Sequence, residues 1–240
     1  MCYGSSCWPW KPSCCNTACL NIPMELIVKL ILSYLLGSVS GSMLMGKLKG
    51  TDIRKMGSGN AGGTNAFRTM GIAFALGVVF IDVLKGYIAV KFLPSLQLWG
   101  ILTENTIDIE LLHQIVCGMG VVIGHVYPIY HGFKGGKGAG TMVGVLVVLF
   151  PLYLIIFLPI WLVVLVFSGY VGLSTMIVGI ALPICTHIFY PNGIYSYFGF
   201  FSVIVSVFII YTHRSNIRRM IDGNENQFEK IMFLRNKSAN

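Results

Sequence analysis

The sequence predicts an all-α integral membrane protein with about seven transmembrane helices, some of them short. Of its 240 residues, 55% are hydrophobic and 11% are charged, whereas an ordinary soluble domain carries about 25% charged residues. Apolar runs close to 20 residues long recur along the chain, and this length crosses a hydrocarbon core of ~30 Å. The runs do not alternate polar and apolar residues, so they lack the strand pattern of a membrane β-barrel.

The formal net charge of +8 fits anionic partners, but in a membrane protein it mainly sets orientation. Basic residues lie in short loops and not along an aromatic-studded face, so we find no nucleic-acid-binding module. We also find no cluster of metal ligands, and we expect neither a metal nor a cofactor.

Residues 1–23 form a Cys-rich N-terminal extension. The cysteines contain no Cys-x-x-Cys pair, so a zinc site is weakly supported, and the stretch lacks the apolar core of a signal peptide. Met24 begins the first membrane run and would serve as a start, which leaves open whether the extension is native. The cysteines of the extension are Cys2, Cys7, Cys14, Cys15 and Cys19.

Residues 24–212 form the predicted membrane domain, and its first apolar run covers 24–46. Small residues at 37–42 let a helix or a ligand tail come close. A second run covers 71–93 and contains Asp82 and Lys85, which share a helical face because they are three residues apart. Charged residues at membrane depth usually pair or face a site, and we expect a structural ion pair here.

Further apolar runs cover 111–130, 142–168, 170–190 and 194–212. The run at 142–168 would be ~40 Å long as one straight helix, which is more than one span needs. Because proline disfavours helix at the preceding residue, we expect a break near Phe150 and Pro151. That break gives seven crossings; a single helix would give six.

The distribution of basic residues favours seven crossings. With seven, thirteen of the 17 Lys and Arg residues share one side: five in the loop at 47–70, two at 131–141 and six at 212–240. The positive-inside rule makes this side cytoplasmic and places the N-terminus outside. Six crossings would place the basic tail on the wrong side.

The loop at 131–141 reads HGFKGGKGAGT, with five glycines and two lysines in eleven residues. Glycine amides can approach a phosphate closely, and lysines add charge. The loop is not a Walker A motif, because Gly138 and not a hydroxyl residue follows Lys137. We interpret it as an anion-binding loop; the alternative is a flexible connector.

Two further polar segments share this chemistry. The loop at 47–70 offers glycine backbone, hydroxyl and amide groups, and Arg68, whose planar fork suits an oxyanion. Thr64 or Asn65 is expected to cap the next helix, whose N-terminus would also favour an anion. The C-terminal segment at 213–240 contains His213 and Asn216, followed by Glu225.

These three segments resemble the three motifs of the bacterial acyl-phosphate:glycerol-3-phosphate acyltransferase family, PlsY, in order and spacing over about residues 24–230. Gly63 is a mild variation where the family has a small residue. The resemblance rests on Gly57-Ser58-Gly59-Asn60 with Thr64, Asn65 and Arg68, on Gly124-His125 with Phe133-Lys134-Gly135-Gly136-Lys137-Gly138, and on His213, Asn216 and Glu225.

The resemblance implies transfer of a fatty acyl group from acyl-phosphate to glycerol 3-phosphate, giving 1-acyl-glycerol 3-phosphate (lysophosphatidate) and phosphate, the first step of phospholipid synthesis. It implies a bacterial inner membrane location, contact with membrane lipid, and contact with the enzyme that makes acyl-phosphate.

The sequence has no Gly-x-Ser-x-Gly nucleophile elbow and no His-x-x-x-x-Asp pair. We therefore expect no Ser–His–Asp mechanism. The small-residue face at 37–42 is a candidate path for the acyl chain.

The resemblance also implies roles for individual residues. Lys134 and Lys137, with the amides of Gly135, Gly136 and Gly138, are expected to hold the phosphate of glycerol 3-phosphate. His213 is expected to orient the glycerol, or to act as a general base; a substrate phosphate is the other candidate proton acceptor. Ser58, Asn60 and Arg68 are expected to hold the other phosphate or the oxyanion, and Asn216 is expected to help orient the glycerol. Further phosphate contacts are expected from Gly57, Gly59, Thr64 and Asn65. His125 and Glu225 are expected to give structural support.

A transporter of an organic phosphate is the alternative function, because basic glycine-rich loops on one face suit such a protein. Transporters usually show internal repeats and midplane sites in broken helices, and we find no repeat in this sequence. The sequence leaves open the acyl-chain preference and the oligomeric state.

Overall fold

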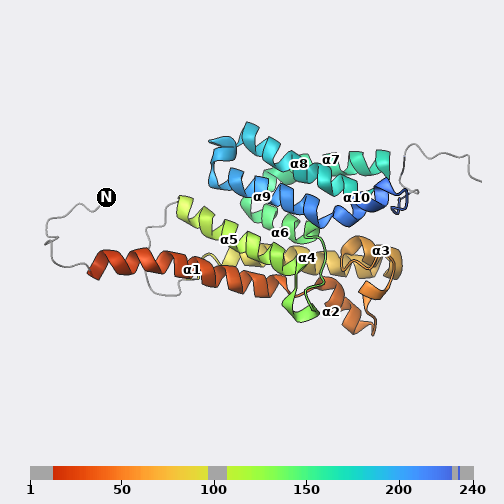
Figure 1. Ribbon diagram of the computed structural model, residues 1–240, viewed down its shortest axis with the longest axis horizontal. Helices are drawn as coiled ribbons and strands as arrows, with labels where there is room; N and C mark the ends of the chain where they lie inside the picture. Colours follow the sequence, from red (N-terminus) through yellow and green to blue (C-terminus); the bar gives the residue numbers. More distant parts are fainter. Residues whose placement is uncertain (1–12, 97–106, 229–231, 233–240) are drawn as a thin grey trace, which may run out of the picture.

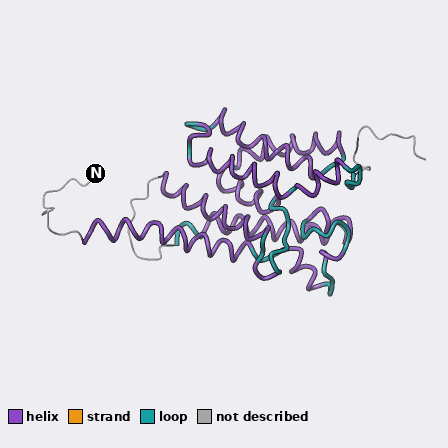
Figure 2. The backbone as a smooth tube through the Cα atoms, in the orientation of Figure 1, coloured by secondary structure: helices purple, strands orange, loops and turns teal. Residues whose placement is uncertain are grey.

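The computed structural model describes residues 13–96, 107–228 and Met232, and for residues 13–23 it describes the backbone alone. All regular secondary structure in these residues is helical (Figure 2). The predicted fold class is therefore confirmed. Residues 1–12, with the first two cysteines of the N-terminal extension, lie outside the described residues.

Seven of the described helices make up the bundle and lie roughly along its long axis (Figure 1). Five of the described helices are long and apolar enough to cross a membrane, and α9 with the following helix, bent by 50°, makes a sixth. The seven are α1 (Ser13–Gly37), α4 (Ile72–Phe92), α5 (Ile107–Val126), α6 (Ala139–Leu149), α7 (Pro151–Ser168), α8 (Val171–Phe189) and α9 (Tyr197–Thr212).

The remaining elements are short. The helices α2, α3 and α10 lie toward one end of the bundle (Figure 1), and the three 3-10 turns lie in loops. They are α2 (Gly41–Leu48), α3 (Gly63–Met70), α10 (Arg214–Ile221), η1 (Ile53–Lys55), η2 (Ile129–His131) and η3 (Gly193–Tyr195).

The apolar run at 142–168 breaks where the sequence predicts. Helix α6 ends at Leu149 and α7 begins at Pro151, which occupies a first-turn position where its missing N–H costs no hydrogen bond. The ring of Phe150 stacks on Phe198 with a centroid distance of 4.6 Å, so the break is packed into the core. With 11 residues, α6 rises only ~16 Å, which makes it one of the expected short helices.

The first apolar run, 24–46, contains a break between two helices. Residues 38–40 separate α1 from α2. The ammonium of Lys85 donates to the carbonyls of Gly37 and Val39, both at 2.8 Å, and the amide of Gly41 donates to Asp82 Oδ1 at 3.2 Å. In a membrane, backbone groups freed by a break need such partners, and α4 supplies them. Asp82 and Lys85 also form the expected ion pair, at 3.1 Å.

The small residues at 37–42 serve helix packing. A Cβ at Gly37 would lie 2.2 Å from the carbonyl oxygen of Val121, and one at Gly41 would lie 2.7 Å from that of Val78. The groups that approach this face are therefore α5 and α4. The expected acyl-chain path along it is occupied by protein.

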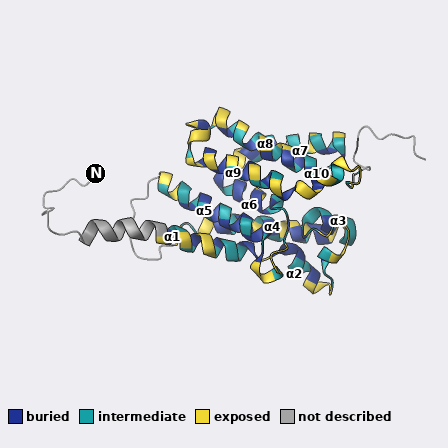
Figure 3. Cartoon of the chain, in the orientation of Figure 1, coloured by how far each residue is buried: buried dark blue, intermediate teal, exposed yellow. Residues whose placement is uncertain are grey.

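The apolar core lies between α4, α5, α6 and α9, with α7 and α8 packed against it. The outer faces of α7 and α8 remain exposed (Figure 3). On α7 these faces are apolar: Leu152 is 68% exposed and Ile155 is 70% exposed. A large exposed apolar surface marks contact with lipid in a chain of this composition.

Helices α4 and α6 pack closely enough to require glycine. A Cβ at Gly144 would lie 2.0 Å from the carbonyl oxygen of Val83, whereas a Cβ at Gly140 would meet Asp82 Cβ at an ordinary 3.4 Å. We therefore expect Gly144→Ala to lower the free energy of unfolding by about 1–3 kcal/mol, the usual cost of overpacking. Unfolding of the purified protein by SDS in mixed micelles measures this change. The control is Gly140→Ala, which is expected to be neutral; equal stability of the two variants would contradict the packing argument.

Candidate active site

The three polar segments predicted to form one site lie toward the same end of the bundle (Figure 1). They are the segment from α2 to α3, the loop between α5 and α6, and the segment that begins with α10. Direct contacts join the three segments.

In the first segment, the side chain of Asn65 shapes the loop. It is 1% exposed; its Nδ2 donates to the carbonyls of Ile53 and Met56 at 3.1 and 3.0 Å, and its Oδ1 accepts from the Ser58 amide at 2.9 Å. A buried amide with these three bonds fixes the backbone of the loop. Gly57 has a φ of +55°, and a Cβ there would lie 2.3 Å from Asn65 Oδ1, so glycine is required.

The predicted cap of α3 is wrong, because Gly62 and not Thr64 or Asn65 occupies the N-cap position. The side chains of Ser58, Asn60 and Thr64 are partly exposed, and none of them has a hydrogen-bond partner among the described residues. Their polar groups are thus available for a ligand. Gly59, with a φ of +72°, completes the turn that presents Ser58.

The glycines of the second segment have a different use from the one predicted. The amide of Gly135 donates to the carbonyl of Val126 at 3.1 Å, and that of Gly136 donates to the carbonyl of His125 at 3.2 Å. These two amides are occupied and do not bind phosphate in this conformation. A Cβ at Gly136 would lie 2.2 Å from His125 Nε2, so glycine permits the loop to fold back on the end of α5.

His125, in the last turn of α5, lies against this loop. Its side chain is 3% exposed, and its Nδ1 lies 3.4 Å from Asp82 Oδ1. The same carboxylate oxygen contacts Lys85 and Gly41. The position of the Gly/Lys loop is therefore tied to the break between α1 and α2.

The second and third segments meet at Lys137, whose ammonium donates to Asn216 Oδ1. Asn216 Nδ2 in turn donates to Glu225 Oε1 at 2.9 Å, and Glu225 Oε2 accepts from Arg219 Nε at 2.7 Å. We call Lys137, Asn216, Arg219 and Glu225 the lysine cluster. Charge-assisted bonds of this kind are strong when the groups are shielded from water, and the Glu225 side chain is only 4% exposed.

The first and third segments meet at Arg68. Its guanidinium donates to the carbonyl of Asn226 at 3.0 Å and lies 4.8 Å from the ring centroid of Phe228. Glu225 and Lys137 are near enough to interact with Arg68 electrostatically. The sequence analysis singled out Arg68 and three of the four cluster residues. It counted Arg219 only among the basic residues of the tail, because nothing local distinguishes Arg219 from Arg218.

Burial lowers the pKa of two groups in the site. It lowers the pKa of Lys137 to about 8, and the neighbouring Arg219 contributes in the same direction. Burial also lowers the pKa of His213 to about 4, so the imidazole is neutral at pH 7. His213 Nδ1 donates to the Ile209 carbonyl at 2.8 Å, which leaves Nε2 as an acceptor.

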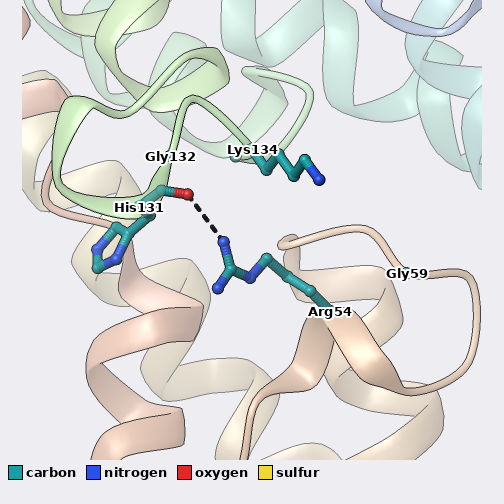
Figure 4. A pocket seen from close by; sticks show the side chains of 6 residues that line it. Arg54, Gly59, His131, Gly132 and Lys134 are labelled. Atoms are coloured by element: carbon teal, nitrogen blue, oxygen red, sulfur yellow. Dashed lines mark hydrogen bonds between the residues drawn. The ribbon is translucent and has the colours of Figure 1, made fainter.

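A cavity of about 440 Å³ lies between the first and second segments (Figure 4). Arg54, which the sequence analysis did not single out, donates from Nη1 to the carbonyl of His131 at 2.9 Å across it. Lys134 and Gly59, both predicted, face the same cavity. Its lining residues are Arg54, Gly59, His131, Gly132, Lys134 and Gly135.

Predicted residues are found in both places: Gly59, Lys134 and Gly135 line the cavity, and Lys137, Asn216 and Glu225 belong to the lysine cluster. Both groups are cationic and suit phosphate esters. Among the side chains that the structure describes, no three of His, Cys, Asp or Glu are grouped to hold a metal ion.

Comparisons with known proteins agree on one family. The family model described as glycerol-3-phosphate acyltransferase matches residues 27–223. A glycerol-3-phosphate acyltransferase of Chlorobium limicola is 37% identical over 232 residues, covering 85% of this chain and 97% of the relative. One from Chlorobium luteolum is 39% identical over 228 residues, covering 85% and 97%.

Two solved structures have the same fold. They are crystal structures of PlsY, an integral membrane glycerol 3-phosphate acyltransferase, in a glycerol 3-phosphate form and a lysophosphatidic acid form. The TM-scores are 0.70 and 0.68 and the sequence identities 32% and 31%, and each match covers 85% of this chain and 95% of the other. These matches favour an acyltransferase over a transporter.

The contribution of the buried Asp82–Lys85 ion pair to stability can be tested at Lys85. Lys85→Met leaves Asp82 buried without its cation, and breaking a buried ion pair costs about 3–5 kcal/mol. We expect a loss of this size in the free energy of unfolding, measured in SDS titrations. Lys91→Met is the control, since Lys91 is exposed in the last turn of the same helix. The double variant with Asp82→Asn is expected to recover part of the loss; a Lys85→Met protein as stable as the control would contradict this role.

Proposed function

The chain belongs to the glycerol-3-phosphate acyltransferase family, and on this premise we propose that it moves a fatty acyl group from acyl-phosphate to glycerol 3-phosphate. The products are 1-acyl-glycerol 3-phosphate and inorganic phosphate. The observation that carries the proposal is the lysine cluster: Lys137, Asn216 and Glu225, with Arg68 beside them, connect all three motif segments at one end of a membrane bundle.

The charges in the site suit two phosphorylated substrates. Glycerol 3-phosphate carries a phosphate at one end, and acyl-phosphate carries one next to the reacting carbonyl. The site end supplies several cations (Arg54, Arg68, Lys134, Lys137 and Arg219) against the carboxylates of Asp52 and Glu225. The surplus of positive charge balances the substrates, which favours binding and stabilises charge that develops during transfer.

The reaction needs no covalent enzyme intermediate, because acyl-phosphate is already activated. The primary hydroxyl oxygen of glycerol 3-phosphate attacks the acyl carbonyl carbon and forms a new ester bond. The bond between that carbon and the phosphate oxygen then breaks, and phosphate leaves with the electron pair. The hydroxyl proton ends on a phosphate oxygen, so atoms and charge balance.

We assign the phosphate of glycerol 3-phosphate to Lys137 and Arg68. Lys137 is already held by Asn216, and Arg68 retains donors beyond its bond to Asn226. The hydroxyl of Ser58 and the amide of Asn60 stabilise the developing oxyanion, since neither side chain has a partner within the part of the chain that the structure describes. Gly57, Gly59, Thr64 and Asn65 shape the loop that presents them.

His213 orients the attacking hydroxyl. Its Nδ1 is committed to the carbonyl of Ile209, so Nε2 accepts the hydroxyl proton as a hydrogen bond. A pKa of about 4 makes the imidazole a weak final proton acceptor at neutral pH. The substrate phosphate, whose second pKa is near 6, is the better acceptor. Asn216 and Glu225 act by holding Lys137 in place.

The chain is an integral membrane protein, and we propose that it lies in the bacterial inner membrane with the site and the C-terminus in the cytoplasm. The uneven distribution of Lys and Arg supports this orientation. A cytoplasmic site also fits a donor delivered by the enzyme that makes acyl-phosphate, which we propose as a contact partner.

A donor-choice assay tests the function. Membranes containing the protein are given labelled glycerol 3-phosphate with acyl-phosphate, acyl-CoA or acyl-carrier protein in separate reactions. We expect labelled lysophosphatidate from acyl-phosphate alone. Product from acyl-CoA would retain the acyltransferase but change the donor. Uptake of label into sealed vesicles, with no product from any donor, would instead support transport.

The same assay tests the residue assignments. Ser58→Ala and Arg68→Ala are expected to abolish turnover while the protein remains in the membrane. The matched controls are Ser215→Ala and Arg218→Ala, at exposed positions of α10, which are expected to keep normal turnover. Near-normal turnover in both site variants would overturn the assignment.

The pH dependence of kcat/KM tests the charge on Lys137. An ammonium loses its proton as pH rises through its pKa, so kcat/KM for glycerol 3-phosphate is expected to fall above about pH 8. In Lys137→Arg the guanidinium stays charged, and the alkaline fall is expected to disappear or move well upward, whatever the activity at pH 7. Initial rates with acyl-phosphate between pH 6 and 10 measure both profiles. An unchanged alkaline limb in the variant would assign the fall to another group.

A further inference from the structure

We propose that the segment Asn226–Phe228, which we call the strap, positions the guanidinium of Arg68, and that Phe228 is the positioning residue through which it acts. The inference rests on the proposed function, in which Arg68 binds the phosphate of glycerol 3-phosphate. It extends the site to a stretch of chain beyond Glu225. Three observations carry it: the strap is held at both ends, it contacts Arg68 twice, and these contacts leave donors of Arg68 free.

The strap is held at both ends. Glu225, the residue before it, bonds through its carboxylate to Asn216 and Arg219, at 2.9 and 2.7 Å. At the other end, the amide of Phe228 donates to the carbonyl of Gly169 at 2.9 Å. Gly169 lies in the turn between α7 and α8, which contributes no residue to the three predicted motif segments. The lysine cluster and the α7–α8 turn therefore fix the strap between them.

The α7–α8 turn fits closely against the strap. Gly169 has a φ of +72°, and a Cβ there would lie 2.7 Å from Met232 Sδ and 3.3 Å from Gln227 Cβ. Glycine adopts this backbone conformation without strain and leaves room for the strap. The position of the strap thus depends on a residue that is far from Arg68 in the sequence.

The strap contacts Arg68 in two ways. The carbonyl of Asn226 accepts from Nη2 of Arg68 at 3.0 Å, and Cζ of Arg68 lies over the Phe228 ring, 4.8 Å from its centroid. The same ring lies 5.7 Å from that of Phe67, the neighbour of Arg68 on α3. A hydrogen bond and a cation–π contact from one short segment restrict the orientation of a long side chain.

These contacts leave Arg68 able to bind a phosphate. The aromatic ring contacts the face of the guanidinium, whereas the N–H groups point outward in its plane. Asn226 uses one of the five N–H donors, so four remain. A free arginine side chain loses much rotational freedom when it binds a ligand. Because the strap already restricts Arg68, less freedom is lost when the phosphate binds.

The first experiment measures KM for each substrate in Phe228→Leu, which keeps an apolar side chain but has no ring face. Loss of the cation–π contact is expected to raise KM for glycerol 3-phosphate about fivefold, while KM for acyl-phosphate stays within about twofold. Phe228→Tyr keeps the ring and is expected to restore the wild-type KM. Phe200→Leu is the matched control, because Phe200 is a 67% exposed aromatic residue in the first turn of α9.

The comparison of Leu with Tyr separates positioning from packing. Equal rises in KM in the two variants, or an unchanged KM in Phe228→Leu, would overturn the proposal. A general loss of structure would raise both KM values and lower the stability to SDS, which also contradicts a role confined to Arg68.

The second experiment displaces the strap from its other end. Gly169→Ala is expected to raise KM for glycerol 3-phosphate, because the added Cβ meets the strap. Gly50→Ala is the matched control: Gly50 also follows a helix and has a φ of +66°, but nothing lies within 4 Å of a Cβ there. The double variant of Gly169→Ala with Phe228→Leu is expected to be no worse than the poorer single variant, since both changes act through Arg68. Additive effects would contradict this route.

The third experiment needs no catalysis. Phenylglyoxal modifies guanidinium groups, and mass spectrometry of the purified protein gives the rate at each arginine. We expect Arg68 to react about fivefold faster in Phe228→Leu than in the wild type. Arg218, whose side chain is 87% exposed, is the internal control and is expected to react at the same rate in both.

Failure of this inference and failure of the proposed function give different results. An enzyme that makes no lysophosphatidate from any donor contradicts the function, and the modification rates still test the strap in that case. Equal rates at Arg68 in the wild type and in Phe228→Leu would overturn the strap by itself, whatever the enzyme makes.

Discussion

A single carboxylate oxygen, Oδ1 of Asp82, holds the site end of the molecule together. It contacts the ammonium of Lys85 at 3.1 Å, the amide of Gly41 at 3.2 Å and Nδ1 of His125 at 3.4 Å. A carboxylate buried among membrane helices is stable only with such partners. The three partners belong to α4, to the start of α2 and to the end of α5. One buried charge therefore fixes both where the first apolar run breaks and where the Gly/Lys loop begins.

The consequences reach each motif segment in turn. Because α2 begins after the break, the loop that follows it returns toward α4, where Asn65 fixes its backbone around Ser58. Because His125 is held, its carbonyl is placed to accept the amide of Gly136, and Lys137 then follows one residue later. From this position Lys137 donates to Asn216. The third segment does not contact Asp82. It depends on Asp82 indirectly, because the lysine cluster connects it to Lys137.

The sequence predicted the features that depend on local patterns and missed those that depend on distant partners. Apolar length and Pro151 were sufficient for the break between α6 and α7. The break at 38–40 contains no proline. It is stabilised by distant partners, the donors of Lys85 and the acceptor of Asp82, so the local pattern of the first apolar run does not indicate it. Glycine is ambiguous for a related reason. The lack of a side chain allows a phosphate to approach the backbone, and it equally allows another part of the protein to do so. At Gly135 and Gly136 the structure shows close packing and amide bonds to backbone carbonyls. Arg54 and Arg219 were missed because in a basic loop a residue that binds is indistinguishable from one that only sets orientation.

The two cationic groups also bear on how two phosphates are held together. Two dianions in a shared site repel each other, and their repulsion is stronger away from water. The cations of the site reduce that repulsion. The cations also repel one another, because Lys137, Arg219 and Arg68 lie close together. Glu225 offsets their charge, while burial still lowers the pKa of Lys137 to about 8. A bound phosphate favours the protonated ammonium and raises that pKa. Binding of glycerol 3-phosphate near pH 8 is therefore coupled to proton uptake at Lys137. The substrate thus brings Lys137 into the charged form that the transfer needs.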